Sequence, residues 1–394
     1  MDLDKYSSFV AALHAVPDPR KARGQRHAWS LILTLIVAAL ASGQKNGRAM
    51  GQWVDLHAEE IASLMQLSAS RLPSTATLRR ALRTLDVTVL EARLADYNRT
   101  LALTTTPDQT IRLRSGVRLA AYAVDGKEVR GAKAHGASLK LVSLVAQGSG
   151  RVGTQAPLAA GQGEQTAVKD LLARHTLDGT ILTLDAGLAT RPLAQQIRDQ
   201  HGHYLMVIKR NQREVYEAIA FLFDQPSGVQ WLPTERATAY RVYQTRSKGH
   251  GRLETRRLEC SPDVNDYLAW PGIGQVIRRT YHSERLKTGK VSQDITYGLT
   301  SLGWDEVTPH ALERLWRAHW TIENRTHYVR DETLGEDRCQ IHVGHAPHAL
   351  AALRNTLICL LRAQGWTNIA DALRDYGSSV KKAFTLIGAL PLRL

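Results

Sequence analysis

Cysteine is scarce in this sequence of 394 residues. The three cysteines, Cys260, Cys339 and Cys359, are odd in number, lie far apart and form no C-x-x-C pair. A disulfide framework and a cysteine-held zinc ion both need paired cysteines, so this pattern argues against both. The composition fits a protein that works in a reducing cytoplasm, and we predict a cytoplasmic location.

A long apolar run is missing as well. The longest, LILTLIVAALA at 31–41, falls well short of the roughly 20 residues that cross a bilayer. It follows a charged, proline-containing segment rather than the start of a signal peptide. We therefore predict a buried helix at this position and no membrane partner.

Acidic residues are outnumbered by basic ones. Lys and Arg total 51 against 37 Asp and Glu, which gives a formal net charge of +14. This excess of positive charge favours a polyanion as the binding partner, and nucleic acid in particular, although basic proteins also bind acidic proteins. The apolar fraction of 43% and the charged fraction of 22% are those of a globular chain.

The pattern of apolar residues changes four times along the chain. Strands and helices alternate in the order β-β-β-α-β-α-β after residue 106, which predicts an α/β core with a mixed sheet. We expect a helical region at 1–105, the first part of the core at 106–211, a β-rich insertion at 212–303, a helical completion of the core at 304–366 and a basic tail at 367–394.

The helical region carries a basic helix, predicted over 77–101 from the helical period of TLRRALRTLDVTVLEARLADYNRTL. Arg79, Arg80 and Arg83 follow the turn RLPSTAT, in which Ser74 or Thr75 is a candidate cap. A short helix, a turn and an arginine-bearing helix are compatible with a DNA-binding helix-turn-helix. A plain bundle with a solvated basic face fits the pattern equally well.

Two aspartates end strands of the expected core. Asp125 closes RLAAYAVD and Asp185 closes GTILTLD, and neighbouring strands would bring both carboxylates to one edge of the sheet. Hard oxygen ligands at such an edge suit Mg²⁺ or Mn²⁺. Glu323 is the candidate third ligand.

Glu323 lies on an apolar helical stripe. Its neighbours at helical spacing are Trp316, His319, Trp320, His327 and Arg330. An isolated carboxylate there is costly unless it is paired or binds a cation, so a metal ion and a salt bridge to a nearby arginine are both open. The acids that follow are expected to form a solvated helix end, namely Asp331, Glu332, Glu336 and Asp337.

A basic segment lies in the expected insertion. KGHGRLETRR places Lys248, His250, Arg252 and Arg256 on a predicted hairpin. It is a candidate contact for a phosphate backbone, and the alternative is a solvated basic turn.

Several separated motifs together resemble a known family. AVDGKEVRGA, LTLDAG, KGHGRLETR and HWTIENRTHYVRDETLGED are similar to bacterial insertion-sequence transposases of the DDE class, and to the ISAs-type group in particular. DPRKARGQRHAWSLILTLIVAALASGQ resembles the helical region that precedes the catalytic domain there. The resemblance spans roughly residues 5–365.

The resemblance implies a ribonuclease H-like core with the catalytic triad Asp125, Asp185 and Glu323. It implies Mg²⁺ or Mn²⁺ in a two-metal site that cleaves double-stranded DNA at transposon ends and joins it to target DNA. Arg330 and His327 become candidate DNA contacts. One departure is visible, because related transposases often carry tyrosine, arginine and lysine where this chain has Trp316, His319 and Arg330.

The assembly and two rival functions complete the expectations. Joining DNA segments implies a homodimer or larger assembly, associated with the nucleoid when bound to DNA. One rival is a metal-dependent nuclease with the same core that cleaves without joining. The other is a DNA-binding protein whose catalytic site has decayed.

Overall fold

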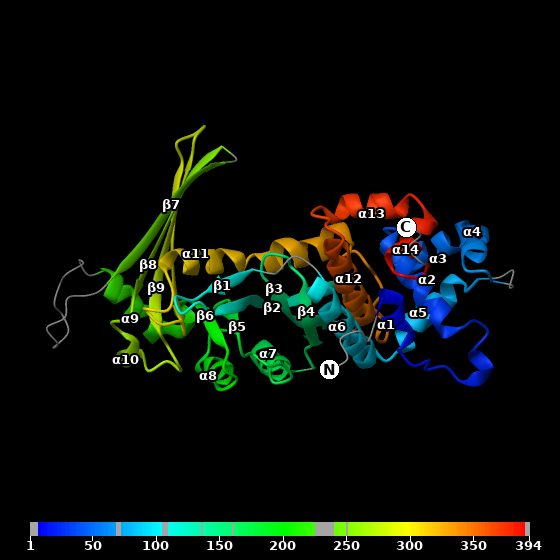
Figure 1. Ribbon diagram of the computed structural model, residues 1–394, viewed down its shortest axis with the longest axis horizontal. Coiled ribbons are helices and arrows are strands. Elements are labelled where there is room, and N and C mark those ends of the chain that lie inside the picture. Colours follow the sequence, from blue (N-terminus) through cyan, green and yellow to red (C-terminus); the bar gives the residue numbers. More distant parts are fainter. Residues whose placement is uncertain are drawn as a thin grey trace.

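The structure of the protein, a computed structural model, describes residues 7–67, 72–104, 109–134, 137–159, 161–224, 240–249 and 251–390. The molecule is elongated, with helices at one end, a sheet covered by helices in the middle and projecting hairpins at the other end (Figure 1). In the described residues, no helix is both long and apolar enough to span a membrane.

The described part of the first hundred residues is mainly helical, as expected. The elements are α1 (Phe9–His14), a short 3-10 turn (Ala22–Gly24), α2 (Trp29–Ala41), α3 (Gly47–Leu56), α4 (Ala58–Leu64), α5 (Thr75–Thr84) and α6 (Val87–Thr104). The apolar run at 31–41 forms the buried helix α2. The stretch predicted as one helix from 77 to 101 breaks between α5 and α6, where the Asp86 carboxylate accepts the N–H groups of Thr88 and Val89 and begins a new helix.

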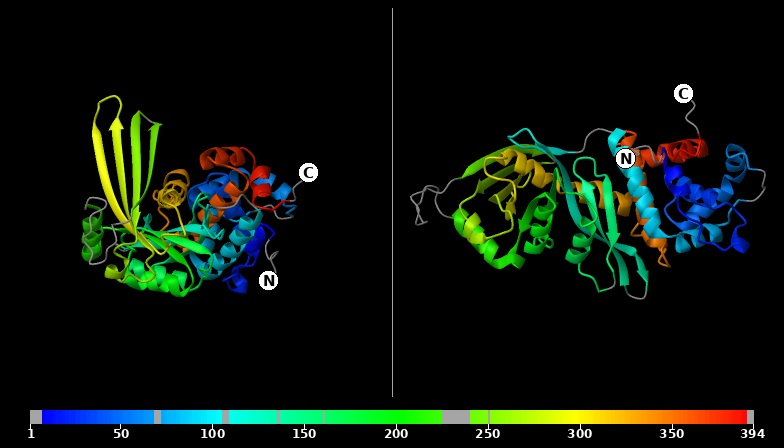
Figure 2. Two further views of the ribbon diagram at one scale, coloured as in Figure 1. Left: turned by 60° about the vertical axis from the view of Figure 1, so that its left-hand side comes forward. Right: turned by 60° about the horizontal axis from the view of Figure 1, so that its bottom comes forward.

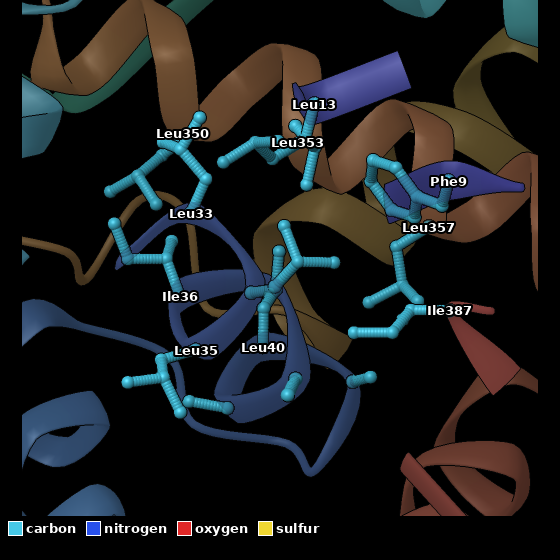
Figure 3. Packing of buried hydrophobic residues seen from close by; sticks show 14 of the residues in the cluster. Phe9, Leu13, Leu33, Leu35, Ile36, Leu40, Leu350, Leu353, Leu357 and Ile387 are labelled. Atoms are coloured by element: carbon cyan, nitrogen blue, oxygen red, sulfur yellow. The ribbon is translucent and has the colours of Figure 1, made fainter. Parts of the chain in front are cut away.

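The end of the chain shares a core with these helices. The segment expected to be a basic tail instead forms α13 (Ile369–Gly377) and α14 (Val380–Leu386), after the long helix α12 (Ala346–Ala363). Figure 3 shows α2 side chains such as Leu33 and Leu40 packed with Leu353 of α12 and with Ile387. The tail prediction was wrong because the charged residues of this segment alternate with buried apolar ones, Phe384 among them.

The sheet core has the predicted order of elements. It contains β2 (Arg118–Ala134), β3 (Ala137–Ala146), β4 (Val152–Pro157), α7 (Glu164–Leu172), β5 (Thr180–Leu184), α8 (Arg191–Asp199) and β6 (His203–Ile208). The spatial order β4-β3-β2-β5-β6 has β2, β3 and β4 antiparallel and β5 and β6 parallel to β2. This confirms a ribonuclease H-like mixed α/β fold. A short strand, β1 (Thr110–Arg112), pairs with β2 and was not predicted.

Helices cover both faces of this sheet. Helices α7, α8 and α9 (Arg213–Asp224) pack on one face through a cluster that includes Leu171, Leu193 and Ile219. Helix α11 (Pro309–Ala318) packs on the other face through Leu312, Leu315 and Trp316. Beyond α11 the helix continues toward α12 and the helical end of the molecule (Figure 1).

The residues expected to form a β-rich insertion extend the same sheet. The strands β7 (Arg241–Gly249), β8 (Arg252–Ser261), β9 (Gln275–Arg285) and β10 (Val291–Thr300) are joined antiparallel, with a short helix α10 (Asn265–Leu268) between β8 and β9. β10 pairs with β6, so that ten strands form one sheet. The far ends of these four strands project beyond the rest of the molecule (Figures 1 and 2).

Candidate active site

Asp125 and Asp185 come from neighbouring strands. In the parallel pair β2 and β5, Val124 lies opposite Leu184, and each aspartate is the next residue along its strand. Neighbouring strands lie about 4.8 Å apart, so the two backbones lie side by side. β2 continues past Asp125 to Ala134, however, so the expected strand end at Asp125 was wrong and only Asp185 follows the end of its strand. The pairing of β2 with β5, rather than a shared strand end, brings the two aspartates together.

Glu323 comes from a widened helix. After α11 the chain forms two π-helical segments, Ile322–His327 and Val329–Thr333, in which the N–H of Tyr328 bonds to the carbonyl of Glu323. Such segments are rare and are frequent at functional sites. The predicted stripe with α-helical spacing is only partly correct, because Trp320, in the turn between α11 and the π-helical segments, is 59% exposed while Trp316 is buried.

Asp125, Glu323 and His327 meet at one point. Nδ1 of the buried His327 lies 3.3 Å from Oε2 of Glu323 and 3.8 Å from Oδ2 of Asp125. One potential ligand atom from each of the three residues lies within 4.8 Å of the others. His327 was expected to contact DNA, whereas here it lies within the carboxylate cluster.

The surroundings shift the pKa values of Asp125 and Glu323 in opposite directions. Burial raises the pKa of Asp125 to about 6, helped by Glu164 and Glu323, while His327 and the Gly126 N–H act in the opposite direction. The hydrogen bond with His327 lowers the pKa of Glu323. Two carboxylates with one imidazole between them leave negative charge that a cation would offset.

Asp185 lies outside that three-residue cluster but in the same cavity. Its carboxylate is half exposed and lies 3.6 Å from Nζ of Lys209. A cavity of about 560 Å³ is lined by Asp125, Asp185 and Glu323 together. The three predicted acids thus share one cavity, although only two of them are in close contact.

His319 lies between the sheet and the helix in this cavity. It is partly buried, and its Nδ1 lies 2.9 Å from the hydroxyl of Thr183, the residue two before Asp185. The loss of solvent around the ring lowers the pKa of His319. Its contact fixes the helix against β5 near the strand end.

The sequence analysis missed the cations of the site. Lys209 and Arg210 follow β6 directly and line the cavity. They could have been found by the argument that identified Asp185, because they occupy the first positions after a buried parallel strand. Lys127, two residues after Asp125, was also missed. It is buried, with Nζ 2.6 Å from the Asp331 carboxylate.

Two expectations were wrong, namely that Arg330 contacts DNA and that Glu336 is solvated. Arg330 is fully buried and donates to Glu336, with Nη2 2.6 Å from Oε1, and Arg354 lies 3.3 Å from the same carboxylate. A side chain with no exposed surface cannot reach DNA in this fold, so Arg330 is not retained as a DNA contact. Glu336 was expected to be solvated and is instead the centre of a buried ion cluster, which lowers its pKa.

Comparison with known proteins identifies the family. The transposase DDE domain matches residues 118–360, and the associated domain, DDE_Tnp_1-associated, matches residues 10–98. The chain belongs to the DDE transposase family.

Individual relatives agree with that assignment. This family member is 24% identical over 364 residues to "Putative transposase YncI" of Escherichia coli O157:H7, covering 90% of this chain and 87% of that one. It is 24% identical over 377 residues to YhhI of Escherichia coli K12, an H repeat-associated protein of the same kind, covering 92% and 91%. A solved piggyBac transposase synaptic complex with hairpin DNA aligns with TM-score 0.44 and 10% identity, over 95% of this chain and 80% of that chain.

The donor set of this DDE family member fits a divalent cation. Carboxylate oxygens are the ligands that Mg²⁺ and Mn²⁺ prefer, and a family with this domain implies such a site. Among the described residues, neither Asp125 nor Glu323 is paired with a lysine or arginine, and one oxygen of each lies within 4.8 Å of the other. Asp125 and Glu323 therefore fit the ion that the family implies.

The basic hairpin forms as predicted, but only some of its basic side chains are exposed to solvent. β7 and β8 pair up to Gly249 and Arg252, and the side chains of Lys248 and Arg252 are exposed at the tip. Arg256 is partly buried and bonded to Glu254 and Ser247. His250 lies outside the described residues.

The predicted arginines of α5 all face solvent. Arg79, Arg80 and Arg83 are exposed, in agreement with a basic face at the helical end of the molecule. Helix α5 packs closely on α3, because Gly51 leaves room for the Thr75 side chain there. Their role in DNA binding stays a prediction.

Proposed function

We propose that this protein is an active DNA transposase of the ISAs-type group that cleaves transposon ends and transfers them into target DNA. The observation that carries the proposal is the convergence of Asp125 and Glu323 around His327, beside the strand end that bears Asp185. The net charge of +14 and the family membership support DNA as the substrate.

Three carboxylates would hold the metal. Asp125, Asp185 and Glu323 are the proposed ligands of a pair of Mg²⁺ or Mn²⁺ ions. When bound, such ions lower the pKa of an attacking water and stabilise the leaving oxygen in phosphoryl transfer. The hydrogen bond from His327 turns the Glu323 carboxylate toward Asp125.

Two cations of the same cavity would act on the substrate. Lys209 and Arg210 line it on the side of β6, within reach of a phosphate held at the carboxylates. Positive groups in that position offset the charge that develops on the phosphate oxygens. The protein thus contributes position and charge rather than a covalent intermediate.

The remaining surface would hold double-stranded DNA. Lys248 and Arg252 at the hairpin tip and the arginines of α5 lie at opposite ends of the elongated molecule (Figure 1). Joining two DNA ends to a target implies a homodimer or larger assembly on DNA. Because these contacts are ionic, affinity is expected to fall steeply with salt.

A strand-transfer assay tests the proposal. The full chain is mixed with DNA carrying both inverted-repeat ends of its element, a target plasmid and Mg²⁺ or EDTA. We expect cleaved and joined products with Mg²⁺ only, and a loss of at least a hundredfold for Asp125→Asn, Asp185→Asn and Glu323→Gln. Asp178→Asn, an exposed aspartate before β5, is the matched control.

Each other outcome contradicts part of the proposal. Cleaved ends without joined product would indicate a nuclease of the same fold. No product from the wild type would indicate a DNA-binding protein with a decayed site. Equal product from wild type and Asp125→Asn would remove the role assigned to Asp125.

A further inference from the structure

A second, separate cavity lies in the helical region. It measures about 240 Å³ and is formed between the loop 20–27 and helix α5. Its polar lining comprises Arg20, Arg26, His27 and Arg80, with the hydroxyl-bearing residues Ser74, Thr77 and Thr84. None of the described residues that line it is acidic, so its charge is of one sign.

The loop that forms one wall is held in place. Arg20 donates to the Asp18 carboxylate through Nε and Nη2, each at 2.8 Å, and to the carbonyl of His27 at 2.8 Å. Its guanidinium also lies over the ring of Trp29, 5.3 Å from the centroid. The guanidinium of Arg20 is thus bonded within the protein and holds the loop in one conformation. Ligand binding at this loop therefore carries only a small cost in conformational entropy.

The two guanidiniums of Arg26 and Arg80 are not neutralised. Both side chains are exposed, and neither makes an ion pair with any residue that the structure describes. They project from opposite walls of the cavity, one from the loop and one from α5. The Ser74 hydroxyl lies 3.2 Å from that of Thr77, so these two hydroxyls form a hydrogen-bonded pair on the α5 wall of the cavity.

We propose that this cavity, here called the α5 cleft, seats a backbone phosphate of duplex DNA. The α5 cleft, at about 240 Å³, has room for a phosphate with a few waters. Arginine is well suited to bind phosphate oxygens in a fork, and hydroxyls contribute further donors.

A phosphate in the α5 cleft would also fix the orientation of the duplex. Arg79 and Arg83 flank Arg80 on the exposed face of α5, so DNA held there runs along a row of cations. The proposal deepens the proposed function and rests on it, because it states how the helical region would hold the DNA substrate.

Binding measured without catalysis tests this inference. A labelled 30-base-pair duplex is titrated with the full chain in EDTA at several KCl concentrations, by fluorescence anisotropy. Arg26→Gln with Arg80→Gln is compared with Arg23→Gln plus Arg48→Gln, two exposed arginines of the same region that do not line the cleft. Both double variants lose the same charge.

We expect the cleft variant to bind about tenfold more weakly, with the slope of log affinity against log salt reduced by about 1. The control variant should keep the slope of the wild type, and Arg26→Lys with Arg80→Lys should recover most of the affinity. Equal losses in both glutamine variants, or no loss in either, would overturn the proposal. A loss confined to single-stranded DNA would overturn it as well.

A single substitution covers the case in which the double variant fails to fold. Thr84→Glu places a carboxylate at the exposed rim of the α5 cleft, and Ser63→Glu on α4 is its control. Only the former should weaken duplex binding. EDTA removes the divalent ions that the carboxylate site needs, so the binding assay does not depend on catalysis. A negative binding result would therefore not contradict the strand-transfer proposal. A negative strand-transfer result would likewise not change the binding result.

Discussion

The Nδ1 atom of His327 lies 3.3 Å from Oε2 of Glu323, one turn earlier on the same widened helix. The same nitrogen lies 3.8 Å from Asp125, which belongs to a strand two hundred residues away in the chain. His327 thus links the helix and the sheet at the point where their carboxylates meet. The predictions below follow from this cluster and its supports.

Stability of the metal-free protein should depend on Asp125. Its pKa is about 6 in the fold and 3.8 as a free side chain, so the folded state holds the proton more tightly. The resulting destabilisation is absent below pH 3.8, grows between 3.8 and 6, and is complete above 6. Discounted for partial exposure, it amounts to about 1–2 kcal/mol.

Urea unfolding in EDTA checks this prediction. Asp125→Asn should be more stable than the wild type at pH 7.5, and the difference should shrink toward pH 4.5. A difference that is the same at both values would contradict the assigned pKa.

Glu336→Gln should destabilise the protein strongly. The substitution leaves Arg330 and Arg354 buried without a counter-charge, which costs about 3–5 kcal/mol. Glu332→Gln removes an exposed partner of Arg338 and should change stability by less than about 1 kcal/mol. Thermal unfolding of the two variants measures the difference, and similar melting temperatures would show that the buried cluster is not needed.

Lys209→Gln should lower the rate and not the stability. Its pair with Asp185 is exposed on both sides and contributes less than about 1 kcal/mol to folding. Loss of a cation beside the reacting phosphate should slow cleavage about tenfold to a hundredfold. Arg213→Gln, from an exposed pair with Glu217 outside the cavity, is the control for the single-turnover rate. Equal rates in both variants would exclude Lys209 from the site.

The fold of the core was predictable because its signals are local. Asp185 follows a buried apolar strand and Asp125 follows the apolar first part of β2, and the order of strands and helices makes these two strands neighbours. The helix break at Asp86 was missed because an aspartate in a helical pattern has the same composition whether it caps a helix or faces solvent. The extension of the core sheet by β7–β10 likewise depends on the pairing of β10 with β6. These two strands are far apart in the sequence, so a local pattern of residues does not predict that they pair.

Contacts made in three dimensions decided what the sequence analysis got wrong about the site. Arg330 and Glu323 both carry the helical spacing of a site residue, but Arg330 is fully buried in an ion pair with Glu336, whereas Glu323 lines the cavity beside His327. The π-helical turns change which side chains share a face, and the sequence has no proline or glycine there to mark them. His327 was placed on the correct helix, whereas its contact with Asp125 is visible only in three dimensions.

Calorimetric titration of the full chain with Mn²⁺ tests the central claim most directly. We predict saturable binding by the wild type and by Asp178→Asn, and at least tenfold weaker binding by Asp125→Asn and by Glu323→Gln, each of which removes one charged ligand. Binding by both site variants as tight as that of the wild type would contradict a metal centre built on these carboxylates.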